Sequence, residues 1–280
     1  MATRREIFNR LYQAAQPLYG DAEARQIAEM LIIAKGKISR NDLIIDPHKE
    51  LIIEELDNII EELRSWRPVQ YIIGFADFYD MELEVGEGVL IPRPETEELV
   101  EWIASESRPE ATILDVGTGS GCIAIALHMA IKESRVCAID ISSKALDIAR
   151  RNGNKYAPEV QFVEGDALGE FDKLFGAKFD VVVSNPPYIP ESDMELMRAN
   201  VTKYEPETAL FVPDSDPLLF YRAIAQTSKR LLKHEGKLYF EIYESFAKET
   251  IAMLETEGYS DIILREDFRG KPRMICATLR

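Results

Sequence analysis

Residues 114–122 have the sequence LDVGTGSGC. An apolar run at 112–116 leads into these glycines, and an apolar pattern with helical spacing follows at 119–129. The sequence therefore predicts a buried strand, a tight turn and a helix. Glycines at such a turn let the backbone bend sharply. They also let a ligand approach without a Cβ in the way, close to the positive N-terminus of the helix.

The alternation of strand and helix continues to the end of the chain. Apolar runs predict strands at 135–139, 160–164, 179–184 and 237–242, and helical patterns occur at 142–152, 217–232 and 246–257. Two further strands, 262–265 and 274–279, are close enough in sequence to form an antiparallel edge. This order predicts an α/β fold: a Rossmann-like, doubly wound, mostly parallel sheet with helices on both faces.

A different pattern precedes residue 93. Residues 1–66 predict a small all-α domain of three helices, the second at 22–34 after a capping Asp21 and the third at 48–66 after Pro47. Residues 67–92 alternate in a way typical of a β-hairpin linker, and a helix is expected to begin at Pro94 within a ligand-binding domain, 93–280. The helical domain has no catalytic constellation, so substrate docking and simple packing are both open.

The composition narrows the class of protein. The 280 residues are 46% apolar and 29% charged, as in an ordinary globular protein, and the net charge is −16. This charge argues against binding of duplex nucleic acid, which needs a basic face. The three cysteines are far apart and the three histidines are isolated, so we expect neither a disulfide nor a metal site. Without a signal-peptide core or a membrane-length apolar run, the expected location is cytoplasmic.

Two aspartates follow the next predicted strands. Asp140 ends the strand after the glycine turn, where a carboxylate can accept hydrogen bonds from both ribose hydroxyls of a nucleoside. This combination fits either a nicotinamide dinucleotide or S-adenosylmethionine, but its spacing is GxGxG and not the GxGxxG of the dinucleotide fingerprint. Asp166 and Ala167 follow the third strand, where they would contact an adenine or simply cap a helix.

The most specific motif is VVVSNPPY at 181–188. Its two prolines fix the backbone and remove two N–H donors, so carbonyl groups remain as acceptors. Asn185 adds a side-chain acceptor, and Tyr188 adds a flat ring. Two acceptors beside a ring suit a planar NH₂ group, such as an amide or the exocyclic amine of a base, held in line with a methyl donor. Hydride transfer requires nothing of this kind, and a purely structural Asn-Pro turn is the simpler alternative.

Together these motifs resemble the class I S-adenosylmethionine-dependent methyltransferases, and more narrowly the PrmC/HemK family of protein-glutamine methyltransferases. Further blocks occur in that family's order: RPVQYIIG at 67–74, VLIPRPETEELV at 89–100 and EPETAL at 205–210. The NPPY motif is shared with adenine methyltransferases, so the 89–100 block carries the narrower assignment. The resemblance covers nearly the whole chain.

The resemblance implies transfer of a methyl group from S-adenosyl-L-methionine to the side-chain amide nitrogen of a glutamine, with S-adenosyl-L-homocysteine as the second product. That glutamine lies in the Gly-Gly-Gln motif of class 1 peptide chain release factors, which would be the partners. Residues 93–95 would lie near the donor or the cleft wall. By the resemblance, the donor-binding residues are Gly117, Thr118, Gly119, Ser120, Gly121, Asp140, Asp166, Ala167 and Asn185. The substrate-binding residues are Asn185, Pro186, Pro187 and Tyr188, of which Asn185, Pro186 and Tyr188 are the catalytic ones.

No general base is evident in the sequence, so the aligned neutral amide would lose its proton to water after transfer. We expect no metal, no direct nucleic-acid contact and no membrane contact, and we expect a monomer. Two segments depart from the family pattern: FVPDSDPL at 211–218 and EIYESF at 241–246. Both are expected to lie away from the glycine turn and from Asn185, and so to affect loop shape or the choice of protein substrate.

Other functions remain open on the sequence alone. A glutamine of a large-subunit ribosomal protein is a close variant, because a sister family shares the motifs. A nucleic-acid adenine methyltransferase shares NPPY but conflicts with the acidic charge. A nicotinamide-dependent oxidoreductase conflicts with NPPY, and a non-catalytic module conflicts with the intact GxGxG, Asp140 and NPPY elements.

Overall fold

The computed structural model describes residues 2–280. The described residues form two compact units, one made of residues 2–75 and 198–204, and the other of residues 76–197 and 205–280. The helical unit thus includes a short segment from the middle of the chain, which contains helix α8 (Ala199–Thr202). Arg198 pairs with Glu23 at 2.7 Å, and the Tyr204 hydroxyl donates to the Ser65 carbonyl at 3.0 Å, so this segment is bound within the helical unit.

The helical unit begins with a strong helix-start signal. Thr3 and Glu6 form a capping box, in which each side chain accepts a hydrogen bond from the other residue's backbone N–H. The elements before residue 75 are β1 (Ala2–Thr3), α1 (Arg4–Gly36), α2 (Arg40–Ile45), β2 (Glu50–Leu51), α3 (Leu56–Arg64) and α4 (Val69–Ile73). Apolar side chains of α1, α3 and α4 form one core, which includes Leu11, Leu31 and Leu63.

Two local predictions for this part of the chain are wrong. Residues 48–55 are not helical, because Glu50–Leu51 pairs with Ala2–Thr3 as an antiparallel two-stranded sheet. The break before the second predicted helix lies at Gly20, whose φ of 74° interrupts α1. Asp21 accepts side-chain hydrogen bonds from Tyr12 and Gln16, and no capping bond to the backbone is formed there.

The predicted hairpin is also shorter than residues 67–92. Residues Val69–Ile73 form helix α4, which ends at Gly74 with a φ of 100°. The hairpin consists of β3 (Phe75–Phe78) and β4 (Met81–Glu84). Its two turn residues, Tyr79 and Asp80, both have positive φ, which is the backbone that a two-residue hairpin turn requires.

The second unit contains the predicted Rossmann-like sheet. Its seven strands have the order β12-β13-β11-β8-β5-β6-β7. Five neighbouring strands are parallel, and β13 and β12 complete one edge in antiparallel pairing, as the sequence predicts. The strands are β5 (Thr112–Val116), β6 (Arg135–Asp140), β7 (Gln161–Glu164), β8 (Phe179–Ser184), β11 (Leu232–Glu241), β12 (Tyr259–Glu266) and β13 (Pro272–Leu279).

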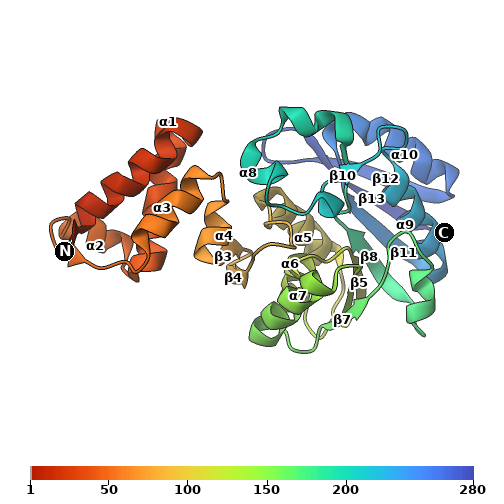
Figure 1. Cartoon of the computed structure of the whole chain (residues 1–280). Helices are drawn as coiled ribbons and strands as arrows, with labels where there is room; N and C mark the ends of the chain where they lie inside the picture. Colours follow the sequence, from red (N-terminus) through yellow and green to blue (C-terminus); the bar gives the residue numbers. More distant parts are fainter. Residues whose placement is uncertain (1) are drawn as a thin grey trace. The chain divides into compact units, whose positions relative to one another are not determined.

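Helices cover both faces of this sheet (Figure 1). One face packs against α5 (Pro94–Glu106), α6 (Cys122–Ala130) and α7 (Ser143–Tyr156), and the other against α9 (Leu219–Leu231) and α10 (Ala247–Thr256). Adjacent strand residues face opposite cores: Ile113 lies in the first core and Leu114 in the second. A sheet covered on both faces therefore needs continuous apolar strands, and such runs made these strands predictable.

The glycine turn shifts one predicted boundary. Helix α6 begins at Cys122 and not at Gly119, because Gly119 and Gly121 both have positive φ. Helix α5 begins at Pro94, as predicted, with acidic Glu95 and Glu97 in its first turn. None of the helices formed by residues 2–280 combines the length and the apolar content needed to cross a bilayer.

Candidate active site

A cavity opens at the carboxyl ends of the parallel strands β5, β6, β7 and β8. This is where ligands bind in open α/β sheets. Its lining includes Arg93, Thr96, Gly117, Thr118, Gly119, Ser120, Asp140, Asp166, Ala167, Asn185, Pro186 and Pro187. The fold thus brings together most of the residues that the sequence analysis selects. Within residues 2–280, the exceptions are Gly121 and Tyr188, which lie outside the lining.

The glycine turn is fixed by hydrogen bonds from its own backbone. The N–H groups of Gly117 and Thr118 both donate to the Ile139 carbonyl at 2.9 Å. Space is open where a Cβ would stand at Gly117 or Gly119, and both line the cavity. Gly121 has a different role, because a Cβ there would lie 3.1–3.3 Å from atoms of Ile125, Ala149 and Phe162. The first two glycines leave room for a ligand, and the third allows close packing of α6.

Asp140 joins the glycine turn to helix α7. Its Oδ2 accepts from the Gly119 N–H at 2.8 Å, and its Oδ1 accepts from the Ser142 N–H at 2.9 Å. Burial raises the pKa of Asp140, and these backbone hydrogen bonds oppose the shift. A carboxylate has about four lone-pair sites, so the side chain can still accept two more hydrogen bonds on the cavity side.

Two further aspartates, Asp166 and Asp115, form hydrogen bonds that hold the loops around the glycine turn and Asp140. Asp166 Oδ1 accepts from the Leu168 N–H at 2.8 Å, which shapes the turn that places Ala167 at the cavity. Asp115, which the sequence analysis did not select as a site residue, lies fully buried under the glycine turn and accepts from the Thr118 hydroxyl at 2.6 Å. Burial raises the pKa of Asp115 to about 7.

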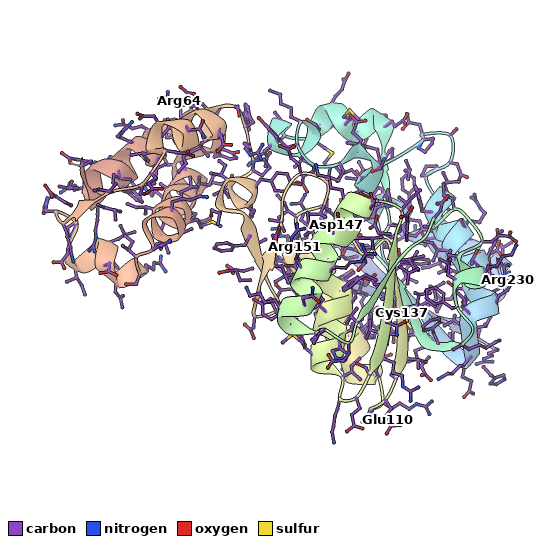
Figure 2. All side chains as sticks on the ribbon, turned by 60° about the horizontal axis from the view of Figure 1, so that its bottom comes forward. Arg64, Glu110, Cys137, Asp147, Arg151 and Arg230 are labelled. Carbon is purple, nitrogen blue, oxygen red and sulfur yellow. The ribbon has the colours of Figure 1, made fainter. Side chains whose placement is uncertain are left out.

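The β3–β4 hairpin is tied to the glycine turn through helix α7. The buried Asn152 side chain donates to the Glu84 and Ser120 carbonyls, at 3.0 and 2.9 Å, and accepts from the Glu84 N–H at 2.7 Å. Arg151, the preceding residue of α7, donates from Nε and Nη2 to the two oxygens of the Glu84 carboxylate. Figure 2 labels Arg151 on this helix. The hairpin therefore helps to hold Ser120 in place.

The NPPY segment at 185–188 is held from two sides. The N–H groups of Tyr188 and Ile189 donate to the Leu210 carbonyl at 3.2 and 2.9 Å. The next residues form a short parallel pair, β9 (Ile189–Pro190) with β10 (Phe211–Val212), which the sequence analysis did not predict. The Tyr188 ring stacks on Tyr243 with ring centres 5.9 Å apart.

Both departures from the family pattern therefore touch this segment. Phe211 belongs to the strand that pairs with Ile189, and Glu241 and Tyr243 contact Tyr188. The expectation that these departures lie away from the Asn185 motif is wrong. Sequence distance misled it, because more than fifty residues separate Tyr188 from Glu241 while their side chains are 3.1 Å apart.

Below Asn185 lies a buried polar network that the sequence analysis missed. Asn185 Nδ2 donates to Thr96 Oγ1 at 3.4 Å, and the Thr96 hydroxyl donates to Glu241 Oε2 at 2.6 Å. The Tyr188 hydroxyl donates to Glu241 Oε1 at 3.1 Å. Burial raises the pKa of Glu241, and the two hydroxyl groups oppose that shift. A carboxylate that ends the apolar run KLYFE was the signal available in the sequence.

The IPRP segment is fixed by a second buried carboxylate. Glu205 accepts from the Ile91 N–H at 3.0 Å and from the Arg93 guanidinium at 2.7 Å. Only 1% of the Glu205 side chain is exposed, against 34% of Arg93. The block at 89–100 and the EPETAL block at 205–210 are therefore in direct contact. Among residues 2–280, no group of three or more His, Cys, Asp or Glu side chains is arranged to hold a metal ion.

The strand order and the cavity define a class I methyltransferase fold. Residues 94–203 match a family model described as "Methyltransferase small domain". A crystal structure of a methyltransferase from Pyrococcus furiosus aligns with a TM-score of 0.52, covering 71% of this chain and 88% of that one. Its sequence identity is 18%, so this likeness concerns the fold alone.

Two relatives match over nearly the full length of this chain. A release factor glutamine methyltransferase from Bacteroides thetaiotaomicron is 42% identical, covering 95% of this chain and 96% of the relative. One from Flavobacterium psychrophilum is 39% identical, covering 96% of each. The chain belongs to the release factor glutamine methyltransferase family, which confirms the resemblance drawn from its motifs.

Proposed function

We propose that this protein transfers a methyl group from S-adenosyl-L-methionine to the side-chain amide nitrogen of the glutamine in the Gly-Gly-Gln motif of class 1 release factors. The observation that carries the proposal is the position of Asn185 and Pro186 in the same cavity as the glycine turn and Asp140. Methyl transfer requires donor and acceptor sites to share one enclosed space, so that the reacting atoms can align.

The residues present fit the donor. The open space next to Gly117 and Gly119 leaves room for part of the donor close to the protein backbone. Asp140 still has free lone pairs that can accept hydrogen bonds from a ribose. Asp166 and Ala167 line the part of the cavity proposed for the adenine, and Thr118 and Ser120 line the part proposed for the methionine end. When bound, the donor supplies a methyl group activated by its positively charged sulfur.

The acceptor site follows from the polarity of the NPPY segment. Asn185 Nδ2 is engaged with Thr96, which leaves Oδ1 to accept one hydrogen of the target amide. The Pro186 carbonyl is proposed to accept the other hydrogen, so that the nitrogen lone pair faces the methyl group. These residues bind and orient a neutral amide, and its surplus proton passes to water after transfer. Pro187, which lines the cavity, is proposed to pack beside the amide. Tyr188 is proposed to support the segment from outside the lining, through its bond to Glu241 and its stacking on Tyr243.

The decisive experiment measures transfer of labelled methyl from S-adenosylmethionine to a purified release factor. The substrate carries the Gly-Gly-Gln glutamine intact or replaced by alanine. Label on the intact protein alone is the expected result. A protein that binds the donor but labels neither form would contradict the proposal, and a ribosomal-protein glutamine and adenine in nucleic acid would then be tested in turn.

Residues 1–66 are proposed to dock the protein substrate, and the enzyme is proposed to act as a monomer in the cytoplasm. Ile44 and Ile45 on α2 are 70% and 73% exposed, which suits contact with a protein surface. The double substitution Ile44→Asp, Ile45→Asp should raise the KM for the full-length release factor and leave a short Gly-Gly-Gln peptide unaffected. Unchanged KM for both substrates would mean that this region only packs.

A further inference from the structure

One buried carboxylate holds two side chains next to Asn185, those of Thr96 and Tyr188. Glu241 ends strand β11, and the residue is 1% exposed. Each carboxylate oxygen accepts from one hydroxyl, Oε2 from Thr96 and Oε1 from Tyr188. The bond from Thr96 is short, at 2.6 Å, and the bond from Tyr188 is longer, at 3.1 Å. A hydroxyl beside a carboxylate oxygen directs its proton toward that oxygen, so both hydroxyl protons have a defined direction.

The direction of the Thr96 proton determines the orientation of Asn185. A hydroxyl has one proton, and Thr96 gives its proton to Glu241 at 2.6 Å. The Thr96 oxygen can then only accept from Asn185, and an acceptor there requires the NH₂ end of the amide. A flipped amide would set its Oδ1 against the Thr96 lone pairs. The network therefore leaves the NH₂ end bound to Thr96 and turns Oδ1 toward a cavity that Asn185 and Thr96 both line.

We infer that Thr96 and Glu241 are positioning residues that fix the amide of Asn185 with its oxygen presented to the substrate. This inference rests on the proposed function, because the presented oxygen matters only if the acceptor is an NH₂ group. Glu241 acts on Asn185 through Thr96 and holds Tyr188 directly, whereas Thr96 acts on Asn185 alone. Substitution of Glu241 should therefore disturb both Asn185 and Tyr188, and substitution of Thr96 should disturb Asn185.

The sharpest test removes one hydroxyl and keeps the shape of the side chain. Thr96→Val should lower kcat/KM for the release factor by about tenfold to a hundredfold, less than the loss on removing a directly contacting group. The Kd of the donor should stay within about twofold. Thr96→Ser keeps the hydroxyl and should restore most of the activity. Thr227→Val, at a buried threonine on α9 outside the cavity lining, is the matched control for loss of a threonine hydroxyl and should behave like the wild type.

A double mutant distinguishes positioning from a general structural effect. Because Thr96 works through Asn185, adding Thr96→Val to Asn185→Ala should cost little beyond Asn185→Ala alone. Losses that multiply in the double mutant would overturn the inference, as would a folded Thr96→Val enzyme with full kcat/KM. Glu241→Gln provides a second route, because its NH₂ group would oppose one of the two hydroxyl donors. It should lower kcat/KM at least as much as Thr96→Val.

One measurement does not depend on turnover. The Asn185 Nδ2 proton that is bonded to Thr96 should exchange slowly with solvent in the wild type and in Thr96→Ser, and at least tenfold faster in Thr96→Val, as seen by NMR of the side-chain amide. If the wild type methylates no release factor yet shows this pattern, the proposed function fails while the positioning network stands. If the release factor is methylated but exchange is equal in all three proteins, the positioning inference fails alone.

Discussion

Asp140→Asn gives the clearest test of the donor site. In the wild type, each carboxylate oxygen accepts one backbone N–H, from Gly119 at 2.8 Å and from Ser142 at 2.9 Å. The remaining lone pairs are proposed to accept the two ribose hydroxyls. An asparagine replaces one oxygen with an NH₂ group, so a donor meets a donor at either Gly119 or Ser142. The variant also loses one ribose acceptor and the charge on the other.

The expected loss follows from these bonds. A hydrogen bond to a charged group contributes about 1.5–3 kcal/mol, and 1.4 kcal/mol corresponds to a factor of ten in affinity. Losing one such bond and weakening the second should reduce donor affinity by about 30- to 150-fold. Asp140→Ala removes both acceptors and should bind the donor more weakly still. The KM for the release factor should change little, because Asn185 and Pro186 are unaltered.

Isothermal titration calorimetry with S-adenosylmethionine and with S-adenosylhomocysteine provides the assay. Both ligands carry the same ribose, so the Kd should rise by the same factor for each. Asp147→Asn is the matched control, since Asp147 lies on α7 with 67% of its side chain exposed and pairs only with Arg150 among residues 2–280 (Figure 2). Donor affinity within about threefold of the wild type in Asp140→Asn would refute the ribose assignment. A loss confined to the charged donor would mean that Asp140 acts on the sulfonium charge.

Three further outcomes test the framework around the site. Glu205→Ala strands the buried Ile91 N–H and the Arg93 guanidinium, and should lower the free energy of unfolding by about 3 kcal/mol in urea titrations, with Glu205→Gln less damaging. Gly121→Ala combines a φ of 84° with contacts of 3.1–3.3 Å, and should cost about 2–4 kcal/mol by the same assay. The pKa of Asp115 is raised to about 7 by burial, so the wild type should lose stability as the pH rises from the unfolded-state value toward 7. Between pH 5 and pH 8 the loss relative to Asp115→Asn should be about 2.5 kcal/mol, and equal pH profiles would contradict it.

The sheet was predictable because the burial of each strand on both faces can be seen in the strand's own residues. A strand covered on both faces needs apolar side chains at successive positions, and Ile113–Leu114 and Val181–Val183 provide them. The helical unit was less predictable, because its errors come from contacts between distant residues. Glu50–Leu51 is extended through pairing with Ala2–Thr3, and helical periodicity around it carries no sign of that partner.

The candidate site likewise contains residues that could be predicted from local sequence and residues that could not. Asp140 and Asn185 sit where strands end, and topology alone brings such positions to one edge of the sheet. The residues that support them come from other segments. Thr96 and Glu241 are 145 positions apart in sequence, yet their oxygens lie 2.6 Å from each other. Motif spacing is local information, so it identified the residues facing the cavity but not the second layer that orients them.

These supporting residues give a physical reason why the blocks at 89–100 and 205–210, and not NPPY alone, indicate a protein-glutamine methyltransferase. The NPPY segment alone is compatible with amide or adenine nitrogen. Here the 89–100 block supplies Thr96 to Asn185, and its Arg93 joins the block to Glu205. The residues after Glu205 lead to Leu210, whose carbonyl accepts from the Tyr188 N–H. The three blocks therefore form one hydrogen-bonded unit around the proposed acceptor site. A change in any of them should alter the orientation in which residues 185–188 meet a substrate.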